Sequence, residues 1–216
     1  MKVLLINGCP RKDECTNRAL KEVIKGLESE GVQGDIFWIG TKPISGCLSC
    51  FQCQTKGECV LNDIVNEFNK KAKDYDGFIF GSPVYYGSAN GSLSSFMDRA
   101  FFSEFASKGY QAEKTYFYLK PAAAVASARR GGTVPTWDQP NKYFALLQMP
   151  ILTGGYWNEV HGHSAADVEK DLEGLQCMRT LGRNMAWFIK IKEAASKAGV
   201  QLPKIETEKF MTDFIR

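Results

Sequence analysis

Short apolar runs alternate with longer amphipathic stretches along the chain. Three of the runs are apolar throughout and are bounded by Gly, Pro or charged residues, as strands buried on both faces are: residues 2–7, 77–84 and 122–128. Two weaker runs, residues 32–39 and 149–154, complete the expected strands. The pattern therefore predicts five strands separated by helices.

Helical periodicity fills the intervening segments. Between residues 17 and 30, apolar side chains recur at three- and four-residue steps, and Gly31 supplies a stop. The longest such pattern covers residues 165–198, where Ser164 and Asp167 fit a capping box at its start. The remaining expected helices span residues 62–72, 92–105 and 137–148.

Strictly alternating strands and helices predict a parallel sheet covered by helices on both faces. In such a three-layer α/β fold, ligands bind beyond the carboxyl ends of the strands. The 216 residues are 44% hydrophobic and contain neither a repeat nor a low-complexity linker, so one domain over residues 1–216 is expected. Its one irregular insertion is the cysteine-rich loop at residues 40–61.

The charge distribution and the short apolar runs exclude several classes of partner. The 27 basic and 24 acidic residues are scattered along the chain, which argues against nucleic acid or a membrane surface. In addition, no apolar run approaches the roughly 18 residues that span a bilayer. We expect a cytoplasmic protein whose partners are small molecules or other proteins. In a reducing compartment, clustered thiols serve metal or redox chemistry more often than disulfides.

The loop after the first strand, NGCPRKDECTNRAL, has the composition of an anion site. Backbone N–H groups and the positive end of the following helix dipole meet there, and Arg11 adds a permanent charge. Thr16 and Asn17 can cap the helix or donate to phosphate oxygens. The loop matches neither GxGxxG nor GxxxxGK[ST], which argues against an ordinary dinucleotide and against a nucleotide triphosphatase.

Two further loops follow the third and fourth strands at the same edge of the sheet. One reads GSPVYYGSANGS, where aromatic residues and Gly suit a flat ring, and the other reads SARRGGT, where a Gly pair can present N–H groups to ring carbonyls. A phosphate at the first loop and a planar heterocycle between the other two fit flavin mononucleotide (FMN) better than AMP.

Four of the seven cysteines are spaced C-x2-C-x2-C-x5-C, namely Cys47, Cys50, Cys53 and Cys59. The two-residue gaps let a tight loop direct three sulfurs inward, and the longer gap returns the fourth, as an iron–sulfur cluster requires. Zinc is the main alternative, although structural zinc sites usually separate two close pairs, and redox-reactive thiols are another. Cys15 is interpreted as a loop thiol and Cys177 as a buried apolar residue.

The segments NGCPRKDECTN and GSPVYYGSANGSLSSFMDRAF, together with the cysteine spacing, resemble the NADPH-dependent FMN reductase branch of the flavodoxin-like proteins. More narrowly, the chain resembles the iron–sulfur flavoproteins over nearly its whole length. In this family the first loop commonly reads NGSPR and binds the FMN phosphate, which assigns the phosphate to residues 9–17. Cys9 here stands in place of Ser, and Asp13 and Glu14 add negative charge.

The resemblance implies a flavodoxin-like sandwich, FMN, a [4Fe–4S] cluster on the four cysteines, and dimers or tetramers that bring flavin and cluster together across chains. The expected FMN-binding residues are Cys9, Arg11, Thr16, Asn17, Pro83, Val84, Tyr85, Tyr86, Gly87, Ala128, Arg129, Gly131 and Gly132. No side chain is assigned as an acid–base catalyst. His161 and His163 are expected in a loop near the flavin ring.

The expected function is that of an oxidoreductase that passes electrons between ferredoxin or NAD(P)H and an unidentified acceptor, because flavin accepts electron pairs and a cluster carries single electrons. One alternative is a cluster-free NAD(P)H-dependent FMN, quinone, nitro or azo reductase. The other is a non-catalytic flavodoxin-like module that binds zinc or senses oxidants.

Overall fold

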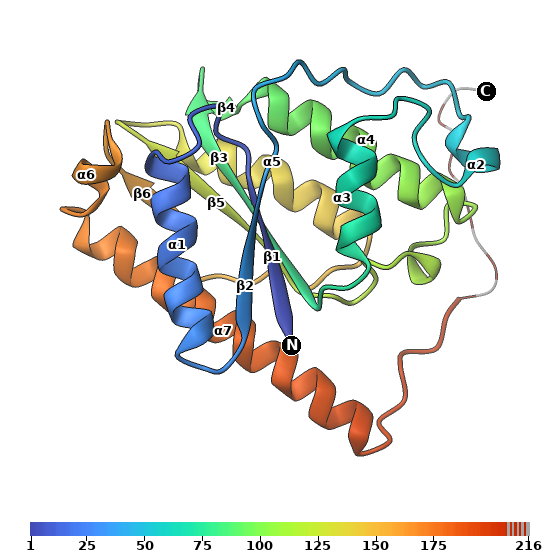
Figure 1. Ribbon diagram of the computed structural model, residues 1–216. Helices are drawn as coiled ribbons and strands as arrows, with labels where there is room; N and C mark the ends of the chain where they lie inside the picture. Colours follow the sequence, from blue (N-terminus) through green and yellow to red (C-terminus); the bar gives the residue numbers. More distant parts are fainter. Residues whose placement is uncertain (207, 209, 211, 213, 215–216) are drawn as a thin grey trace.

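The computed structural model describes residues 1–206, 208, 210, 212 and 214. Its central sheet is parallel, with the strand order β2-β1-β3-β5-β6 (Figure 1). These strands are β1 (Lys2–Asn7), β2 (Gln33–Trp38), β3 (Gly77–Tyr85), β5 (Ala122–Ala128) and β6 (Glu159–His161). A two-residue strand, β4 (Ser88–Ala89), folds back antiparallel on the end of β3.

Helices cover both faces of the sheet, as the alternating pattern predicts. One face carries α1 (Cys15–Glu28), α6 (Ala165–Val168) and α7 (Leu172–Lys197), and the other carries α3 (Ile64–Ala72), α4 (Gly91–Ser107) and α5 (Thr133–Leu146). Successive strand side chains point to opposite faces, so Leu4 and Ile6 pack toward α3, α4 and α5, whereas Val3 and Leu5 pack toward α1 and α7. Both cores are apolar, which explains why the central strands β1, β3 and β5 are largely apolar.

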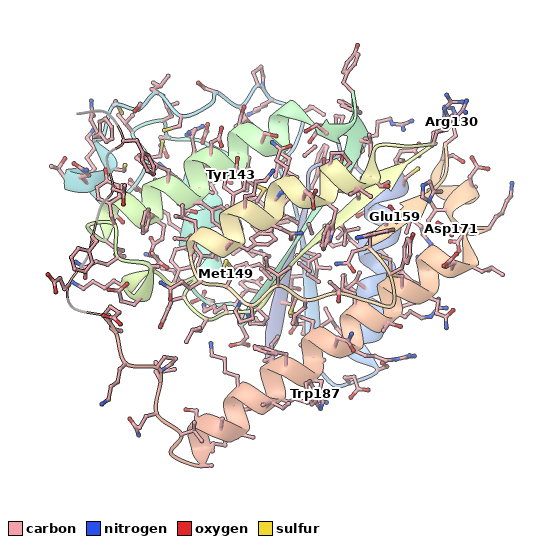
Figure 2. The ribbon with its side chains drawn as sticks, turned by 180° about the vertical axis from the view of Figure 1, so that it is seen from behind. Arg130, Tyr143, Met149, Glu159, Asp171 and Trp187 are labelled. Carbon is pink, nitrogen blue, oxygen red and sulfur yellow. The ribbon has the colours of Figure 1, made fainter. Side chains whose placement is uncertain are left out.

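The fifth strand was predicted in the wrong place. Residues 149–154 form only a single bridge, between Ile151 and Ala122, and the strand that completes the sheet is β6. Figure 2 shows the coil that connects Met149 to Glu159. The buried Asn158 stabilises this coil, because its Nδ2 donates to the carbonyls of Ala124 (3.0 Å) and Leu152 (3.2 Å). Its amide thereby supplies hydrogen bonds that a continuous strand would have made.

The long pattern at residues 165–198 is two helices rather than one. The capping box of Ser164 and Asp167 is confirmed at the start of α6. α6 ends at Val168, and Asp171 begins α7 by accepting a hydrogen bond from the Gly174 N–H at 2.9 Å.

Helix α5 begins at Thr133, four residues before the predicted start, because Pro135 fits the first turn of a helix.

Helices α1 and α7 cross at a pair of glycines. A Cβ on Gly26 would lie 2.2 Å from the Arg179 carbonyl oxygen, and one on Gly182 would lie 2.2 Å from that of Val23. Beside this crossing the carboxylate of Glu22, only 2% exposed, forms ion pairs with Arg18, Lys25 and Arg179. The two helices therefore pack backbone against backbone and are joined by a buried carboxylate.

The cysteine-rich segment lies outside the sheet and along α4 (Figure 1). Residues 40–52 have no regular structure, and a single helical turn follows, α2 (Cys53–Lys56), which ends at Gly57 with a positive φ of 76°. A short 3₁₀ helix, η1 (Ala112–Lys114), follows α4. Among the described helices, none is long and apolar enough to cross a membrane.

Candidate functional site

Three loops at the carboxyl edge of the sheet meet in one pocket. The pocket lies between the loops that follow β1, β3 and β5, with the end of β6 beside them. Its lining consists of Cys9, Arg11, Cys15, Thr16, Pro83, Val84, Tyr85, Ser127, Ala128, Arg129, Gly162 and His163. The structure therefore brings together residues from all three segments expected to bind FMN.

The buried side chain of Asn7 fixes the shape of the first loop. Its Oδ1 accepts from the Cys9 N–H (3.0 Å), and its Nδ2 donates to the Lys12 carbonyl (2.9 Å). From the neighbouring strand, Trp38 Nε1 donates to the Cys9 carbonyl at 2.7 Å. Burial raises the pKa of the Cys9 thiol, so a neutral S–H stands where the family commonly has Ser.

The first turn of α1 faces this pocket without a side-chain cap. Glu14 occupies the N-cap position, but its carboxylate accepts from the Ala165 N–H at 3.2 Å instead of from α1. The first N–H groups of a helix have no partner within the helix, so they are available to an anion together with the positive end of the dipole. The guanidinium of Arg11 lies 3.7 Å from Glu14 and is 61% exposed, free to turn toward a ligand.

Two of the expected phosphate ligands are engaged in other contacts. The Thr16 and Ser127 hydroxyls are hydrogen bonded at 2.8 Å, which joins the first loop to the end of β5. Asn17 Nδ2 donates to Asp13 Oδ1 (3.1 Å), and Asn17 does not line the pocket. Asp13 and Glu14 thus each have a partner within the protein, which reduces the repulsion expected between their carboxylates and a phosphate dianion.

The Tyr86–Gly87 turn connects β3 to β4 as a two-residue hairpin. Both residues have positive φ, 51° and 72°, as a type I′ turn requires, and the Tyr86 side chain is fully exposed at the tip. Gly132 (φ 97°) packs under this hairpin, where a Cβ would lie 2.8 Å from Val84 Cγ1 and 2.9 Å from Gly87 Cα. Tyr86, Gly87, Gly131 and Gly132 do not themselves line the pocket.

The two histidines are separated by the structure. His163 lines the three-loop pocket, whereas His161 lines a neighbouring hollow with Tyr156, Trp157 and Asp171. Sequence reasoning missed Ser127, Gly162 and Cys15 as lining residues, and Cys15 is the buried first residue of α1 rather than a loop thiol. Ser127 begins the SARRGGT segment, so its place at the end of a strand was the available signal. His163 was expected in a loop near the ring and does line this pocket, whereas the position of Gly162 was not predicted because β6 was not expected.

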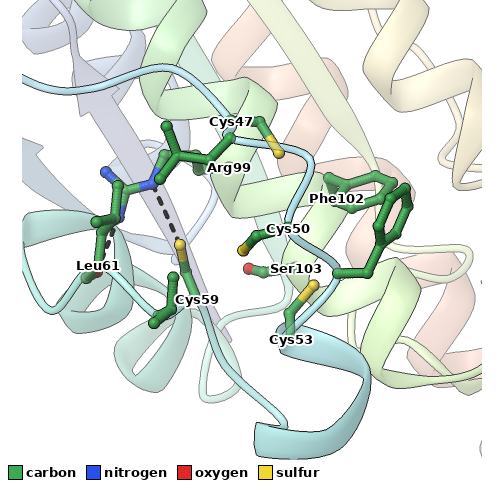
Figure 3. A pocket seen from close by; sticks show the side chains of 11 residues that line it. Cys47, Cys50, Cys53, Cys59, Leu61, Arg99, Phe102 and Ser103 are labelled. Atoms are coloured by element: carbon green, nitrogen blue, oxygen red, sulfur yellow. Dashed lines mark hydrogen bonds between the residues drawn. The ribbon is translucent and has the colours of Figure 1, made fainter.

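The four cysteines of the C-x2-C-x2-C-x5-C segment line a second pocket (Figure 3). Apolar side chains surround them: Leu48, Phe51, Val60, Leu61 and Phe102. Cys53 is buried, Cys47 and Cys50 are exposed, and all four are unpaired. Within the described part of the chain, no group of three or more His, Cys, Asp or Glu side chains is placed to hold a single metal ion.

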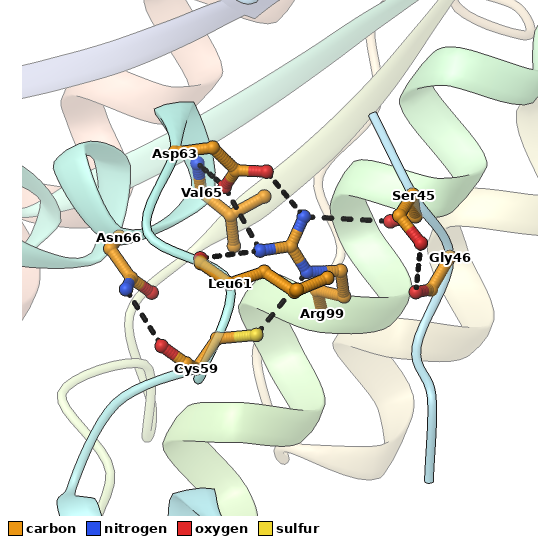
Figure 4. A network of polar contacts seen from close by, with 8 residues as sticks. All are labelled: Ser45, Gly46, Cys59, Leu61, Asp63, Val65, Asn66 and Arg99. Carbon is orange, nitrogen blue, oxygen red and sulfur yellow. Dashed lines mark hydrogen bonds and ion pairs between the residues drawn. The ribbon is translucent and has the colours of Figure 1, made fainter. Parts of the chain in front are cut away.

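A buried arginine closes the inner side of the cysteine pocket. Arg99, on α4, is 1% exposed, and its guanidinium makes a two-point ion pair with Asp63 at 2.6 and 2.9 Å (Figure 4). Its Nε lies 3.3 Å from Cys59 Sγ. Asp63 also caps α3 by accepting from the Val65 N–H. An arginine within the largely apolar stretch FMDRAFF was the sequence signal for this site, and sequence reasoning missed it.

Helix α4 links the two pockets. At its start, Asn90 caps the helix and donates from Nδ2 to the Gly8 carbonyl (2.8 Å) in the first loop. Phe102 and Ser103, near its other end, line the cysteine pocket. The 11 residue steps from Gly91 to Phe102 correspond to about 16 Å of helix. The pockets are therefore distinct sites, and α4 connects the wall of the cysteine pocket to the first loop.

Solved structures place the fold in a known class. A flavodoxin, WrbA-like protein from Agrobacterium tumefaciens covers 88% of this chain and 98% of its own, with a TM-score of 0.61 and 15% identity. A flavoenzyme NAD(P)H:(acceptor) oxidoreductase from Paracoccus denitrificans covers 88% and 97%, with a TM-score of 0.62 and 16% identity. The expected flavodoxin-like fold is confirmed.

Sequence relatives give the family. Residues 1–164 match the family described as NADPH-dependent FMN reductase. An iron–sulfur flavoprotein of Methanocaldococcus jannaschii is 31% identical over 196 residues, which cover 88% of this chain and 98% of the relative. The chain belongs to the NADPH-dependent FMN reductase family and is a flavin-dependent oxidoreductase.

Proposed function

We propose that the chain binds FMN in the three-loop pocket and a [4Fe–4S] cluster in the cysteine pocket, and that it passes electrons between NAD(P)H or a ferredoxin-type protein and an acceptor. The observation that carries the proposal is that four thiols from a thirteen-residue segment line one pocket whose other walls are largely apolar. A donor set of thiols alone suits iron–sulfur clusters and zinc. The compact spacing and the iron–sulfur flavoprotein relative support the cluster.

The residues of the three-loop pocket fit FMN. The uncapped first turn of α1 and Arg11 offer N–H donors and positive charge for a phosphate. Pro83, Val84 and Tyr85 offer an apolar wall for a ring, and Arg129 lies opposite on the loop after β5. Bound FMN would accept an electron pair and release single electrons, and a cluster carries single electrons. The protein's own contribution is binding, orientation and exclusion of water.

The separation of the two pockets supports a homodimer or homotetramer in which the cluster of one chain lies near the flavin of another. Exposed aromatic and apolar side chains stand beside each pocket: Tyr85 and Tyr86 near the first, Leu48 and Phe51 near the second. Burying such side chains in a subunit interface would be favourable. Sedimentation of the loaded protein tests this part of the proposal, and a monomer would contradict it.

The decisive experiment is anaerobic purification followed by measurement of FMN, iron and acid-labile sulfide per chain. We expect about one FMN and about four irons. The variant Cys50→Ala should lose iron and keep FMN, whereas Cys177→Ala, which removes a buried thiol outside the cysteine pocket, should keep both.

Other results would identify the alternatives. FMN without iron, together with steady-state NAD(P)H oxidation, would indicate the cluster-free reductase. Zinc in place of iron, with no turnover, would indicate the non-catalytic module, for which membership of an oxidoreductase family gives no support.

A further inference from the structure

Arg99 holds both ends of the cysteine segment. Besides Asp63, its Nη1 donates to the Ser45 carbonyl (3.5 Å) before Cys47, and its Nη2 donates to the Leu61 carbonyl (2.8 Å) after Cys59. Figure 4 shows these contacts converging on one guanidinium. A planar guanidinium with several N–H donors is suited to fixing several acceptors at once. The start and end of the segment are thus tied to one point on α4.

The contact to Cys59 is chemically distinct from the others. Arg99 Nε, 3.3 Å from Cys59 Sγ, directs a charged N–H group at a sulfur atom, and a neutral thiol is a weak acceptor. The same cysteine is fixed from its other side, because Asn66 Nδ2 donates to the Cys59 carbonyl at 2.8 Å. A cation with 1% exposure that points at sulfur is better matched to a sulfur atom that carries negative charge.

We propose that Arg99 is a positioning residue for the cluster: it orders the cysteine segment and donates a hydrogen bond to the sulfur of Cys59, which raises the reduction potential of the cluster. This inference rests on the proposed function. Reduction adds negative charge to the cluster, and hydrogen bonds to the sulfurs are among the determinants of its potential. A donor at Cys59 stabilises the reduced form more than the oxidised form, because the attraction grows with the charge.

The test compares the loaded wild-type protein with Arg99→Lys, which keeps the positive charge and removes the Nε–H donor, and with Arg99→Gln, which also removes the charge. Iron per chain, FMN per chain and the rate of iron loss to a chelator are measured for each protein. The midpoint potential of the cluster is measured in dye-mediated titrations. We expect both variants to lose iron to a chelator at least tenfold faster. In the iron-loaded fraction, we expect the one-electron reduction constant to fall at least tenfold, which corresponds to 59 mV.

Two controls separate positioning from general damage. Arg179→Lys makes the same substitution on α7, where Arg179 pairs with Glu22 and not with the cysteine segment. It should leave the iron content and the midpoint potential of the cluster unchanged. Asn66→Ala loosens the backbone of Cys59 without removing the donor to its sulfur, so iron should be lost faster at an unchanged potential.

Each outcome decides the proposal. A rate of iron loss and a one-electron reduction constant within threefold of wild type in both Arg99 variants would overturn it. Loss of FMN along with iron would also overturn it, because Arg99 does not line the FMN pocket and a role confined to the cluster predicts normal FMN content. Wild-type protein without iron would instead overturn the proposed cluster itself, so the two failures are distinguishable.

Discussion

The hydroxyl of Thr16 lies 2.8 Å from the hydroxyl of Ser127, and this buried contact joins the first turn of α1 to the end of β5 at the three-loop pocket. The two residues are 111 positions apart in sequence. Their contact holds two of the three pocket loops at a fixed separation, so under the proposed function it bears directly on the affinity for FMN.

Replacing Thr16 with Val keeps the shape of the side chain and removes this hydrogen bond. Because a buried hydrogen bond contributes about 1 kcal/mol, we expect the dissociation constant for FMN to rise about fivefold. Fluorescence titration of the apoprotein measures it. Thr115→Val removes another buried hydroxyl, which donates to the Ala112 carbonyl, away from the pocket, and should leave FMN affinity unchanged. Wild-type affinity in Thr16→Val would contradict the role of this contact.

Gly132 and its neighbour Gly131 offer a matched pair of substitutions. Alanine at Gly132 would meet Val84 and Gly87 and would have to adopt a φ of 97°, at a cost of about 1–3 kcal/mol. Alanine at Gly131 meets nothing within 4 Å. We expect Gly132→Ala to displace the β3–β4 hairpin, weaken FMN binding and lower the melting temperature. Gly131→Ala should change neither, and equal effects from both variants would show that the packing under the hairpin is unimportant.

The carboxylate of Glu22 makes the free energy of unfolding depend on pH. Burial opposes its charge, but hydrogen bonds from Lys25, Arg179 and Arg18 lower its pKa from 4.5 to about 2. Because the folded-state pKa is the lower one, this contribution, on the order of 3 kcal/mol, is complete above pH 4.5 and is lost as the pH falls toward 2.

Urea unfolding of Glu22→Gln tests this dependence. At pH 7 the variant should be less stable than wild type, and the difference should shrink progressively below pH 4.5. Glu28→Gln, on the exposed side of the same helix, should follow wild type at every pH. A difference for Glu22→Gln that stays constant between pH 7 and pH 3 would contradict the assignment.

Gly182 allows the closest approach of α7 to α1. A methyl group there would meet the Val23 carbonyl oxygen at 2.2 Å, and since backbone atoms cannot move aside, the helices must separate. We expect Gly182→Ala to destabilise the protein by about 1–3 kcal/mol and to lower its melting temperature. Gly91→Ala, at the first residue of α4 with nothing within 4 Å, is the control and should melt no lower than wild type. A similar melting temperature for both variants would refute the close crossing.

Apolar runs and turn residues predicted most of the fold. The strands at residues 2–7 and 122–128 were found because they are buried on both faces. Strand β6 was missed because it has three residues, Glu159–His161, and only its central valine is buried. The break between α6 and α7 was missed because apolar periodicity continues across it, and Asp171 acts as a cap only once its side chain turns back to Gly174.

The candidate sites were predictable where residues are close in sequence and unpredictable where they are distant. The cysteine spacing indicated the second pocket, since its four sulfurs lie within thirteen residues. The clamp from Arg99 to Ser45 and Asp63 joins positions 54 and 36 residues away, and only the packing of α4 brings them together. Asn17, an expected phosphate ligand, is held by Asp13 through a contact that composition does not reveal.

Arg99, Phe102 and Ser103, which line the cysteine pocket, lie on a helix that also forms part of the apolar core. Other side chains of that helix, including Phe96 and Phe101, pack in the core between the sheet and the helices. The inner wall of the cysteine pocket therefore exists only once the core has formed. In small zinc domains, by contrast, the metal drives folding. If the proposed cluster binds in this pocket, it binds to a chain whose core has already formed, so the folded apoprotein would be the acceptor in the loading step.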